Sequence, residues 1–209
     1  KVCEDWFSRL RKSLVQTSLV AKAPFHVLEF SGRRISELCR ILSKAPSRED
    51  VKKFKGELDS LVLSYLGALQ EVRDSDAVDG FAAWAKTALK PISALKDCAG
   101  WIQALSLQCR GRLQEAEELY QKSFLSSSLY PEVYFFIVRN AARCCIETAD
   151  WEKWQQWEKR FEDFASQDRL CGEENQYFAL KRQLGDLFND NLINATMNFD
   201  AGEILQAEE

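Results

Sequence analysis

The sequence is poor in the residues from which most catalytic sites are built. Its 209 residues include a single histidine, His26, with only 9 Gly and 4 Pro and no Gly-x-Gly tripeptide. One histidine in an apolar stretch does not provide the base that a nucleophilic Ser or Cys needs. A phosphate cradle requires a glycine-rich loop. We therefore expect no catalytic residue in this chain. Because Gly and Pro are few, we also expect too few tight turns for a β-sandwich or barrel.

Metal-binding patterns are also absent. The 7 Cys are an odd number and contain no Cys-x-x-Cys pair. A zinc site needs ligands clustered at short spacing. We therefore expect no metal or cofactor in the chain. We expect the cysteines to be free, buried thiols, as in a protein of a reducing compartment. No apolar run approaches the roughly 20 residues that span a bilayer, so we expect a soluble, cytoplasmic protein without membrane contact.

Charge is unevenly distributed along the chain. The formal net charge is −4, but residues 1–55 hold 13 basic and 6 acidic side chains, a net of +7, which leaves −11 for the rest. A basic end suits RNA or an acidic neighbour. Helix faces in contact with solvent explain the same pattern, and we favour that reading. The acidic runs "EAEELY" (115–120) and "GEEN" (172–175) are interpreted as helix faces and starts without a matching partner.

Apolar residues recur at helical spacing along nearly the whole chain, and almost nowhere with the alternation of a strand. A second helix is expected over about 25–43, and a third from a cap at Ser47 to about residue 72. Before them, a first apolar stripe consists of Cys3, Trp6, Phe7, Leu10 and Leu14.

The later helices are expected to begin and end at recognisable residues. Asp74 or Ser75 caps a helix. Gly111 fits a left-handed helix end, and Pro131 fits the first turn of the next helix. A last helix pair is expected within residues 177–193. The helix after Asp74 begins its buried face with Val78, Phe81, Ala82 and Trp84.

A helix–turn–helix unit recurs in the second half of the chain. The spacing of Gly111, Ala116 and Tyr120 resembles the second helix of a tetratricopeptide repeat. In a degenerate copy, Ala149-Asp150-Trp151 replaces the glycine turn, and the stripe continues through Trp154, Trp157, Phe161 and Phe164. The sequence therefore predicts an all-α fold, an α-solenoid of antiparallel helix pairs of the tetratricopeptide or HEAT type. We expect helical hairpins over 1–73, continuous with tetratricopeptide-like repeats over 74–209.

Residues 151–157 hold three of the 6 Trp, which raises the question of an aromatic cage. Trp151, Trp154 and Trp157 recur at three-residue steps and share one broad helical face. A cage needs rings that converge from several segments, and one helix cannot supply them. We therefore interpret the three Trp as core. The adjacent Cys144 and Cys145 point about 100° apart on a helix and are not a plausible redox pair.

Several segments together resemble the FAT region of the phosphatidylinositol-3-kinase-related protein kinases. The first motif is Asp74, Ala77, Gly80 and Trp84; the second is Gly111, Arg112 and Ala116; the third is Ala149, Asp150, Trp151 and Trp157. Their order and spacing cover about residues 1–165, and "KVCEDWFSR" at the start adds to them. The resemblance is strongest to the branch that acts in nonsense-mediated mRNA decay.

The resemblance implies a non-catalytic helical scaffold that clamps and regulates the kinase domain of the same polypeptide and links it to an N-terminal helical arch. The parent enzyme would use ATP and Mg²⁺, at a site outside this chain, to phosphorylate an RNA helicase at Ser/Thr-Gln. Regulatory subunits of the decay kinase complex would be further partners. Some members bind an inositol phosphate, for which no basic motif matches here.

Two alternatives from other classes remain. A free-standing tetratricopeptide-like adaptor would bind a peptide or partner protein on a concave surface. The mostly apolar segment "VYFFIVRNAARCCI" (133–146) favours burial against more protein instead. An RNA-binding scaffold would use the basic residues 1–55, but we expect no direct contact with nucleic acid.

Overall fold

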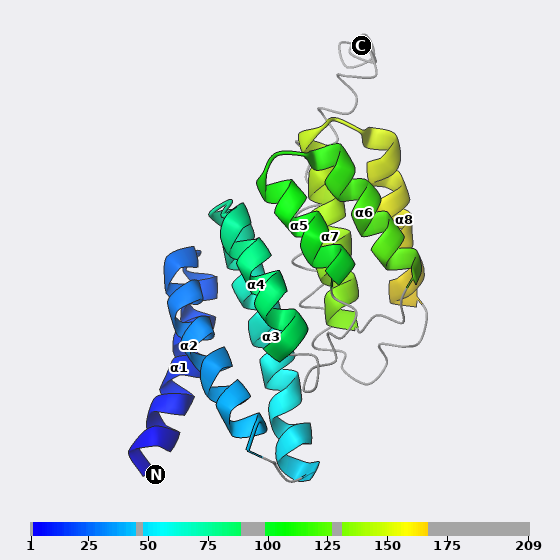
Figure 1. Cartoon of the computed structure of the whole chain (residues 1–209). Coiled ribbons are helices and arrows are strands. Elements are labelled where there is room, and N and C mark those ends of the chain that lie inside the picture. The colour runs from blue at the N-terminus through cyan, green and yellow to red at the C-terminus, as the bar shows by residue number, and fades with distance from the viewer. Residues whose placement is uncertain (1, 45–47, 89–98, 127–130, 167–209) are drawn as a thin grey trace, which may run out of the picture. The chain divides into compact units, whose positions relative to one another are not determined.

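The described part of the chain is entirely helical. The computed structural model describes residues 2–44, 48–88, 99–126 and 131–166, and these contain no strand. The expected all-α fold is thus confirmed. The helices are α1 (Val2–Val20), α2 (Pro24–Leu42), α3 (Arg48–Glu71), α4 (Ser75–Ala88), α5 (Ala99–Cys109), α6 (Leu113–Ser126), α7 (Pro131–Glu147) and α8 (Trp151–Ser166) (Figure 1).

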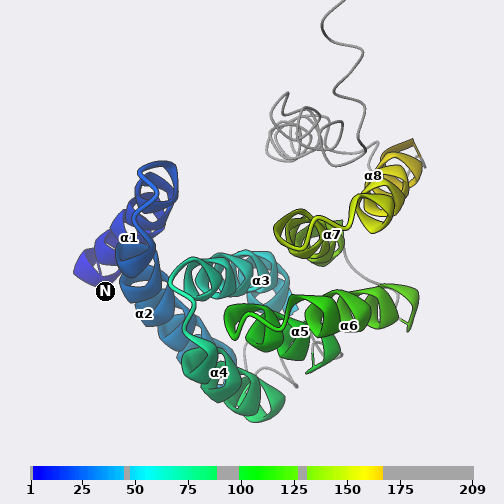
Figure 2. The same cartoon turned by 90° about the horizontal axis from the view of Figure 1, so that it is seen from above.

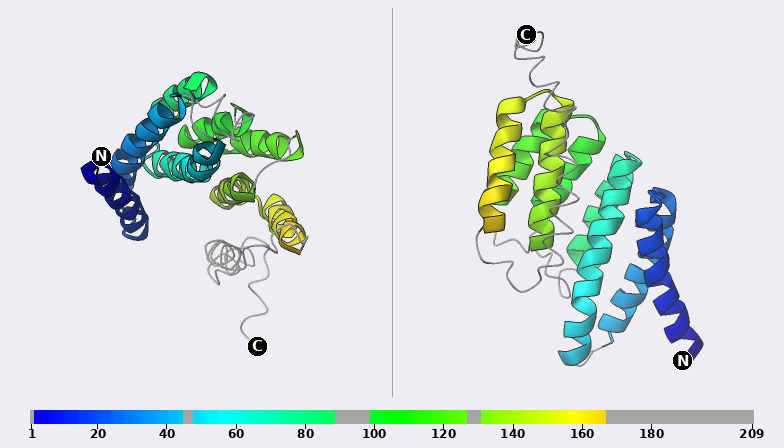
Figure 3. Two further views of the ribbon diagram at one scale, coloured as in Figure 1. Left: turned by 90° about the horizontal axis from the view of Figure 1, so that it is seen from below. Right: turned by 180° about the vertical axis from the view of Figure 1, so that it is seen from behind.

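The chain forms two compact units, Lys1–Arg112 and Leu113–Glu209. In the first unit α1 packs on α2 and α2 on α3, while α4 and α5 pack on each other and on α3 (Figure 2). In the second unit α7 packs against both α6 and α8 (Figure 3). Within each unit, successive helices are therefore neighbours, as an array of helix pairs requires. The expected division after residue 73 stays a prediction; it coincides with the turn between α3 and α4.

Four of the turns share one backbone conformation, in which the helix ends on a left-handed residue. Lys22 has φ 50°, Arg73 φ 55°, Gly111 φ 76° and Ala149 φ 54°. Glycine adopts this conformation without strain, whereas Arg73 and Ala149 adopt one that side chains disfavour. The expected left-handed end at Gly111 is confirmed, and the Ala149 turn takes the place of a glycine turn as expected.

At two of these turns an aspartate begins the next helix. The Asp74 carboxylate accepts a hydrogen bond from the Ala77 N–H (2.9 Å), so Asp74 rather than Ser75 is the cap. The Asp150 carboxylate accepts one from the Lys153 N–H (3.2 Å).

The other expected boundaries agree closely where they can be compared. The second helix runs from Pro24 to Leu42 and the third ends at Glu71. Pro131 is the first residue of α7, where its missing N–H costs no helical hydrogen bond. The cap expected at Ser47 and the helix pair expected within 177–193 lie outside the described residues.

Two expectations about buried faces need correction. The expected first apolar stripe contains Trp6 and Leu10, but these are 59% and 38% exposed, whereas the buried apolar residue described on α1 is Val15. Trp84 was expected on the buried face of α4, but it is 37% exposed. Helix α4 instead buries Val78 and Ala85, which are seven residues apart and so lie two turns apart on one side.

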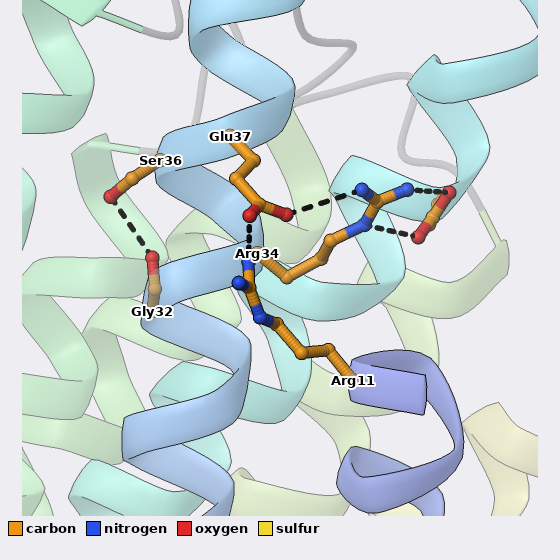
Figure 4. A network of polar contacts seen from close by, with 6 residues as sticks. Arg11, Gly32, Arg34, Ser36 and Glu37 are labelled. Atoms are coloured by element: carbon orange, nitrogen blue, oxygen red, sulfur yellow. Dashed lines mark hydrogen bonds and ion pairs between the residues drawn. The ribbon is translucent and has the colours of Figure 1, made fainter. Parts of the chain in front are cut away.

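A buried arginine ties three helices of the first unit together. Arg34 on α2 is 6% exposed and donates to both carboxylate oxygens of Glu57 on α3, at 2.9 and 3.2 Å. It also donates to Glu37 (3.3 Å), and the other oxygen of Glu37 pairs with Arg11 on α1 (Figure 4). Because the two Arg–carboxylate contacts to Glu57 are bidentate, they fix orientation as well as distance.

The backbones of α2 and α3 also approach each other closely near this network. A Cβ atom added to Gly32 would lie 3.3 Å from the ring of Tyr65 on α3, so glycine lets α2 and α3 come together at this level. One turn later, the Ser36 hydroxyl donates to the Gly32 carbonyl (3.0 Å), which Figure 4 also shows.

We expect Arg34→Lys to lower the free energy of unfolding by about 1.5–3 kcal/mol, because lysine keeps the charge but loses the bidentate geometry. Urea unfolding followed by circular dichroism measures this. The matched control is Arg33→Lys on the same helix, whose side chain is 66% exposed, and it should change stability by less than about 0.5 kcal/mol. Equal effects of the two variants would contradict the role given to Arg34.

Candidate functional site

The later motif residues gather in the second unit, around a buried carboxylate. Ala116 and Tyr120 on α6 are each 0% exposed, and Trp154 and Trp157 on α8 are 3% and 1% exposed. Trp151 is only partly buried. The interpretation of the Trp series as core thus holds for Trp154 and Trp157. Of these residues, Trp157 contacts the buried carboxylate of Glu117.

Glu117 joins α6 to α8 through two polar contacts. It is 3% exposed, and its Oε1 accepts a hydrogen bond from the Trp157 indole N–H at 3.0 Å. The Lys153 ammonium lies 3.1 Å from the second oxygen, Oε2. A carboxylate removed from water requires such partners, because an unmatched buried charge is strongly unfavourable.

Lys153 extends the network to the start of α8. Its ammonium lies 3.7 Å from Oδ2 of Asp150, whose other oxygen caps the helix. The hydrogen bond to Glu117, followed by the charges of Glu117 and Asp150, raises the pKa of Lys153. The ammonium is therefore held in its charged form, and the capping turn is tied to α6.

Sequence analysis missed this network, because "EAEELY" was interpreted as a helix face without a matching partner. That interpretation was wrong for Glu117, which pairs with Lys153 and Trp157. A signal was present in the spacing. Glu117 lies three residues before the buried Tyr120, so the two side chains share one side of α6.

Aromatic rings from three helices meet beside this network. Phe124 on α6 lies 4.9 Å from Tyr134 on α7 and 5.5 Å from Trp157 on α8, between ring centroids. The expectation that one helix cannot assemble such a group is correct, but neighbouring helices supply the other rings. The Tyr134 hydroxyl donates to the backbone carbonyl of Arg160 (2.7 Å), and burial raises the pKa of Tyr134.

The cluster already holds a cation from the chain itself. The guanidinium carbon of Arg160 lies 4.6 Å from the ring centroid of Trp157 and 5.5 Å from that of Phe124. Contacts of this kind are attractive because the faces of aromatic rings are electron-rich. The arrangement is therefore a packed aromatic core with an internal cation.

The two adjacent cysteines are free, and each is 1% exposed. Burial raises the pKa of Cys145 to about 12, and the charges of Glu117 and Asp150 act in the same direction. Burial also raises the pKa of Cys144, well above its usual range. Because the thiolate is the reactive form, both groups are inert thiols at neutral pH.

The remaining motif residues belong to the first unit. Asp74 and Ala77 form the cap of α4, and Gly111 forms the left-handed turn before the exposed Arg112. Gly80 is exposed, and a Cβ atom there would meet no atom within 4 Å, so nothing in the structure requires glycine.

A metal site and a membrane span have no candidate in the described residues. No group of three or more His, Cys, Asp or Glu side chains in the described ranges could hold a metal ion. Among the described helices, none has the length and apolarity needed to cross a membrane. Glu117 and Lys153 are partners of each other, so what the arrangement does is hold α6 and α8 together while both pack on α7.

Comparison with known proteins gives one consistent family. The family model described as serine/threonine-protein kinase smg-1 matches residues 1–200. A curated relative, the serine/threonine-protein kinase SMG1 of Danio rerio, is 21% identical over an alignment of 200 positions that covers 76% of this chain. The probable serine/threonine-protein kinase smg1 of Dictyostelium discoideum is 25% identical over 84 positions, 40% of this chain. The chain spans 5% and 3% of the lengths of these relatives. No solved structure matches it.

We expect the Glu117–Trp157 hydrogen bond to contribute about 1.5–3 kcal/mol, because its acceptor is charged and buried. A double-mutant cycle of Glu117→Ala and Trp157→Phe, read by urea unfolding, measures the coupling. The control Glu118→Ala removes an exposed carboxylate from the same helix and should show no coupling with Trp157→Phe. A coupling below about 0.5 kcal/mol between Glu117 and Trp157 would contradict the prediction.

Stability should fall as the pH rises above the ordinary thiol pKa of 9.0, because unfolded Cys144 and Cys145 then release protons that the folded thiols retain. For each thiol, the free energy of unfolding should fall by about 1.4 kcal/mol per pH unit, until the pH reaches the raised pKa of the folded thiol. Urea unfolding with reductant at about pH 8, 9 and 10 measures the slope. The variant Cys144→Ala/Cys145→Ala should show a shallower slope. An unchanged slope would mean that the two thiols titrate normally in the folded chain.

Proposed function

Because the chain belongs to the smg-1 family of serine/threonine-protein kinases, we propose that it is a non-catalytic helical scaffold of such a kinase. In this role it clamps and regulates the kinase domain of the same polypeptide. The observation that carries the proposal is the buried network of Glu117, Lys153 and Trp157, in which charged groups serve helix packing. Kinase activity, with ATP and Mg²⁺, would then depend on residues outside this chain.

A more specific assignment rests on the motifs in the sequence. We place the chain in a FAT-type region that wraps the kinase domain and links it to an N-terminal helical arch. The parent kinase would act in the cytoplasm, in nonsense-mediated mRNA decay, and phosphorylate an RNA helicase at Ser/Thr-Gln with regulatory subunits bound. The order of the motifs around Asp74, Gly111 and Asp150 supports this assignment, and each motif forms a cap or turn.

The physical role follows from how the helices are joined. In a helical array each element contacts its neighbours, so strain spreads over many small interfaces. Buried polar contacts such as Arg34–Glu57 and Glu117–Trp157 keep each interface in one register. A scaffold of this kind biases which conformations of an attached kinase domain are populated.

The rival function is a free-standing adaptor that binds a peptide. Such an adaptor presents polar side chains along its inner helices. The central helix of the second unit, α7, instead has ten buried positions within Val133–Cys145, only one of which, Asn140, is a polar residue other than Tyr and Cys. That composition favours packing against protein over peptide capture.

We expect Trp154→Ala in the full-length kinase to lower phosphorylation of a Ser-Gln peptide about tenfold, although Trp154 touches no substrate in this proposal. The substitution removes a buried indole and should cost about 3–5 kcal/mol of local stability. Activity and recovery of the assembled complex are measured together. The matched control, Trp84→Ala, removes a tryptophan that is 37% exposed and should leave both nearly unchanged.

Removal of residues 76–164 should have the larger effect and abolish regulated activity. If that deletion left both kinase activity and complex assembly unchanged, the scaffold function would be wrong. If the chain expressed alone bound a partner protein as tightly as the full-length kinase does, the adaptor function would be favoured.

A further inference from the structure

The ion pair between α6 and α8 combines a buried carboxylate with a partly exposed amine. The side chain of Lys153 is 38% exposed, whereas the side chain of Glu117, whose Oε2 lies 3.1 Å from the ammonium, is 5% exposed. Lys153 belongs to the first turn of α8, and the positions Ala149 and Glu152 around this turn are exposed. A reagent in solution can therefore reach the ammonium but not the carboxylate that the ammonium neutralises.

The buried charge network of the first unit differs in this respect. There the pairing cation is Arg34, whose side chain is 8% exposed. A guanidinium keeps its charge under all physiological conditions, whereas a lysine amine is a target of acetylation, which removes the charge. The second unit therefore places its pairing cation where a chemical modification can neutralise it.

Neutralisation of Lys153 would leave two carboxylates without their shared cation. Lys153 is the cation that pairs with Glu117, and its ammonium also lies 3.7 Å from Oδ2 of Asp150. Glu117 would keep the hydrogen bond from the Trp157 indole (3.0 Å), but its buried charge would have no counter-ion among the described residues. Removal of one member of a buried ion pair is strongly destabilising, because the remaining charge is unmatched away from water.

We propose that Lys153 is an acetylation site and that its acetylation releases α8 from α6. The co-reactant is an acetyl thioester of the coenzyme A type. The lone pair of the deprotonated amine attacks the thioester carbonyl carbon, a C–N bond forms, the C–S bond breaks, and the departing thiolate takes up a proton. The ammonium thus gives up two protons, one to solvent and one to the thiolate, and becomes a neutral amide. The inference goes beyond the proposed function, because it concerns the contact between α6 and α8 whether or not a kinase domain is attached.

The ion pair that holds the two helices together also protects the amine. The hydrogen bond to Glu117, followed by the charges of Glu117 and Asp150, raises the pKa of Lys153, so the neutral, nucleophilic amine is scarce while the contact is closed. Opening of the contact frees the amine for acetylation, and the acetylated side chain cannot form the ion pair again. Acetylation therefore traps the open arrangement, which is a population shift produced by a covalent change.

The test uses the purified 209-residue chain in which Nε-acetyl-lysine replaces Lys153 through an expanded genetic code. The matched control carries the same modification at Lys159, which is exposed on the same helix. Hydrogen–deuterium exchange measures how readily the backbone amides of α6 and α8 open. We expect acetylation at Lys153 to accelerate this exchange about tenfold or more, and acetylation at Lys159 to leave it nearly unchanged.

A second variant separates the loss of charge from the bulk of the acetyl group. Glu117→Gln removes the unmatched charge and keeps an acceptor for the Trp157 N–H, so it should return the exchange of the acetylated chain most of the way to that of the unmodified chain. Lys153→Gln should reproduce the effect of acetylation, whereas Lys153→Arg should not, because arginine keeps the charge. If acetylation unfolds the chain and Glu117→Gln does not restore folding, the bulk of the group is responsible and the proposal is wrong.

The reaction itself is measured on the unmodified chain with acetyl-coenzyme A at about pH 8. Mass spectrometry of proteolytic fragments follows acetylation of Lys153 and Lys159, with and without urea below the unfolding midpoint. We expect Lys153 to react more slowly than Lys159 without urea, and urea to accelerate the reaction of Lys153 more than that of Lys159. A Lys153 that stays unmodified under both conditions would overturn the proposal, and so would equal amide exchange in the two acetylated chains.

Discussion

The burial of the Glu117 carboxylate is the constraint on which the second unit depends. A charged group at 3% exposure is tolerated only with matched donors, and these come from Lys153 and Trp157 on a different helix. Helix α8 therefore cannot slide or rotate along α7 without separating Glu117 from its partners. The aromatic contacts between Phe124, Tyr134 and Trp157 alone would allow several packings of similar energy, whereas the directional hydrogen bond selects one.

The first unit also contains a buried charge matched from a neighbouring helix, but that charge is positive. There the buried group is a cation, Arg34, and the matched carboxylates are Glu57 on the next helix and Glu37 on its own. In both units a buried charge reaches a neighbouring helix beside a close or aromatic contact, Gly32 against Tyr65 in one and Phe124 against Trp157 in the other. Apolar packing supplies most of the stability, and the buried charge determines the register.

Local signals in the sequence predicted the fold well, because helix ends are determined by neighbouring residues. Asp74, Gly111 and Pro131 could be interpreted from the chain alone, since a cap, a left-handed glycine and an N-terminal proline act within a few residues. Which side of a helix is buried depends on distant neighbours. The exposed sides of Trp6 and Trp84, and the pairing of Glu117 with a residue 36 positions away, were not predicted for this reason.

The buried network of the second unit supports the proposed scaffold function over a ligand-binding site. A catalytic or binding site needs polar groups whose partners are incomplete until the ligand arrives. In the second unit the buried carboxylate of Glu117 is matched from within by Lys153 and Trp157, and Arg160 lies over the ring of Trp157. Because Glu117 takes both of its partners from within the unit, its carboxylate serves helix packing, which is the property that the proposed scaffold function needs.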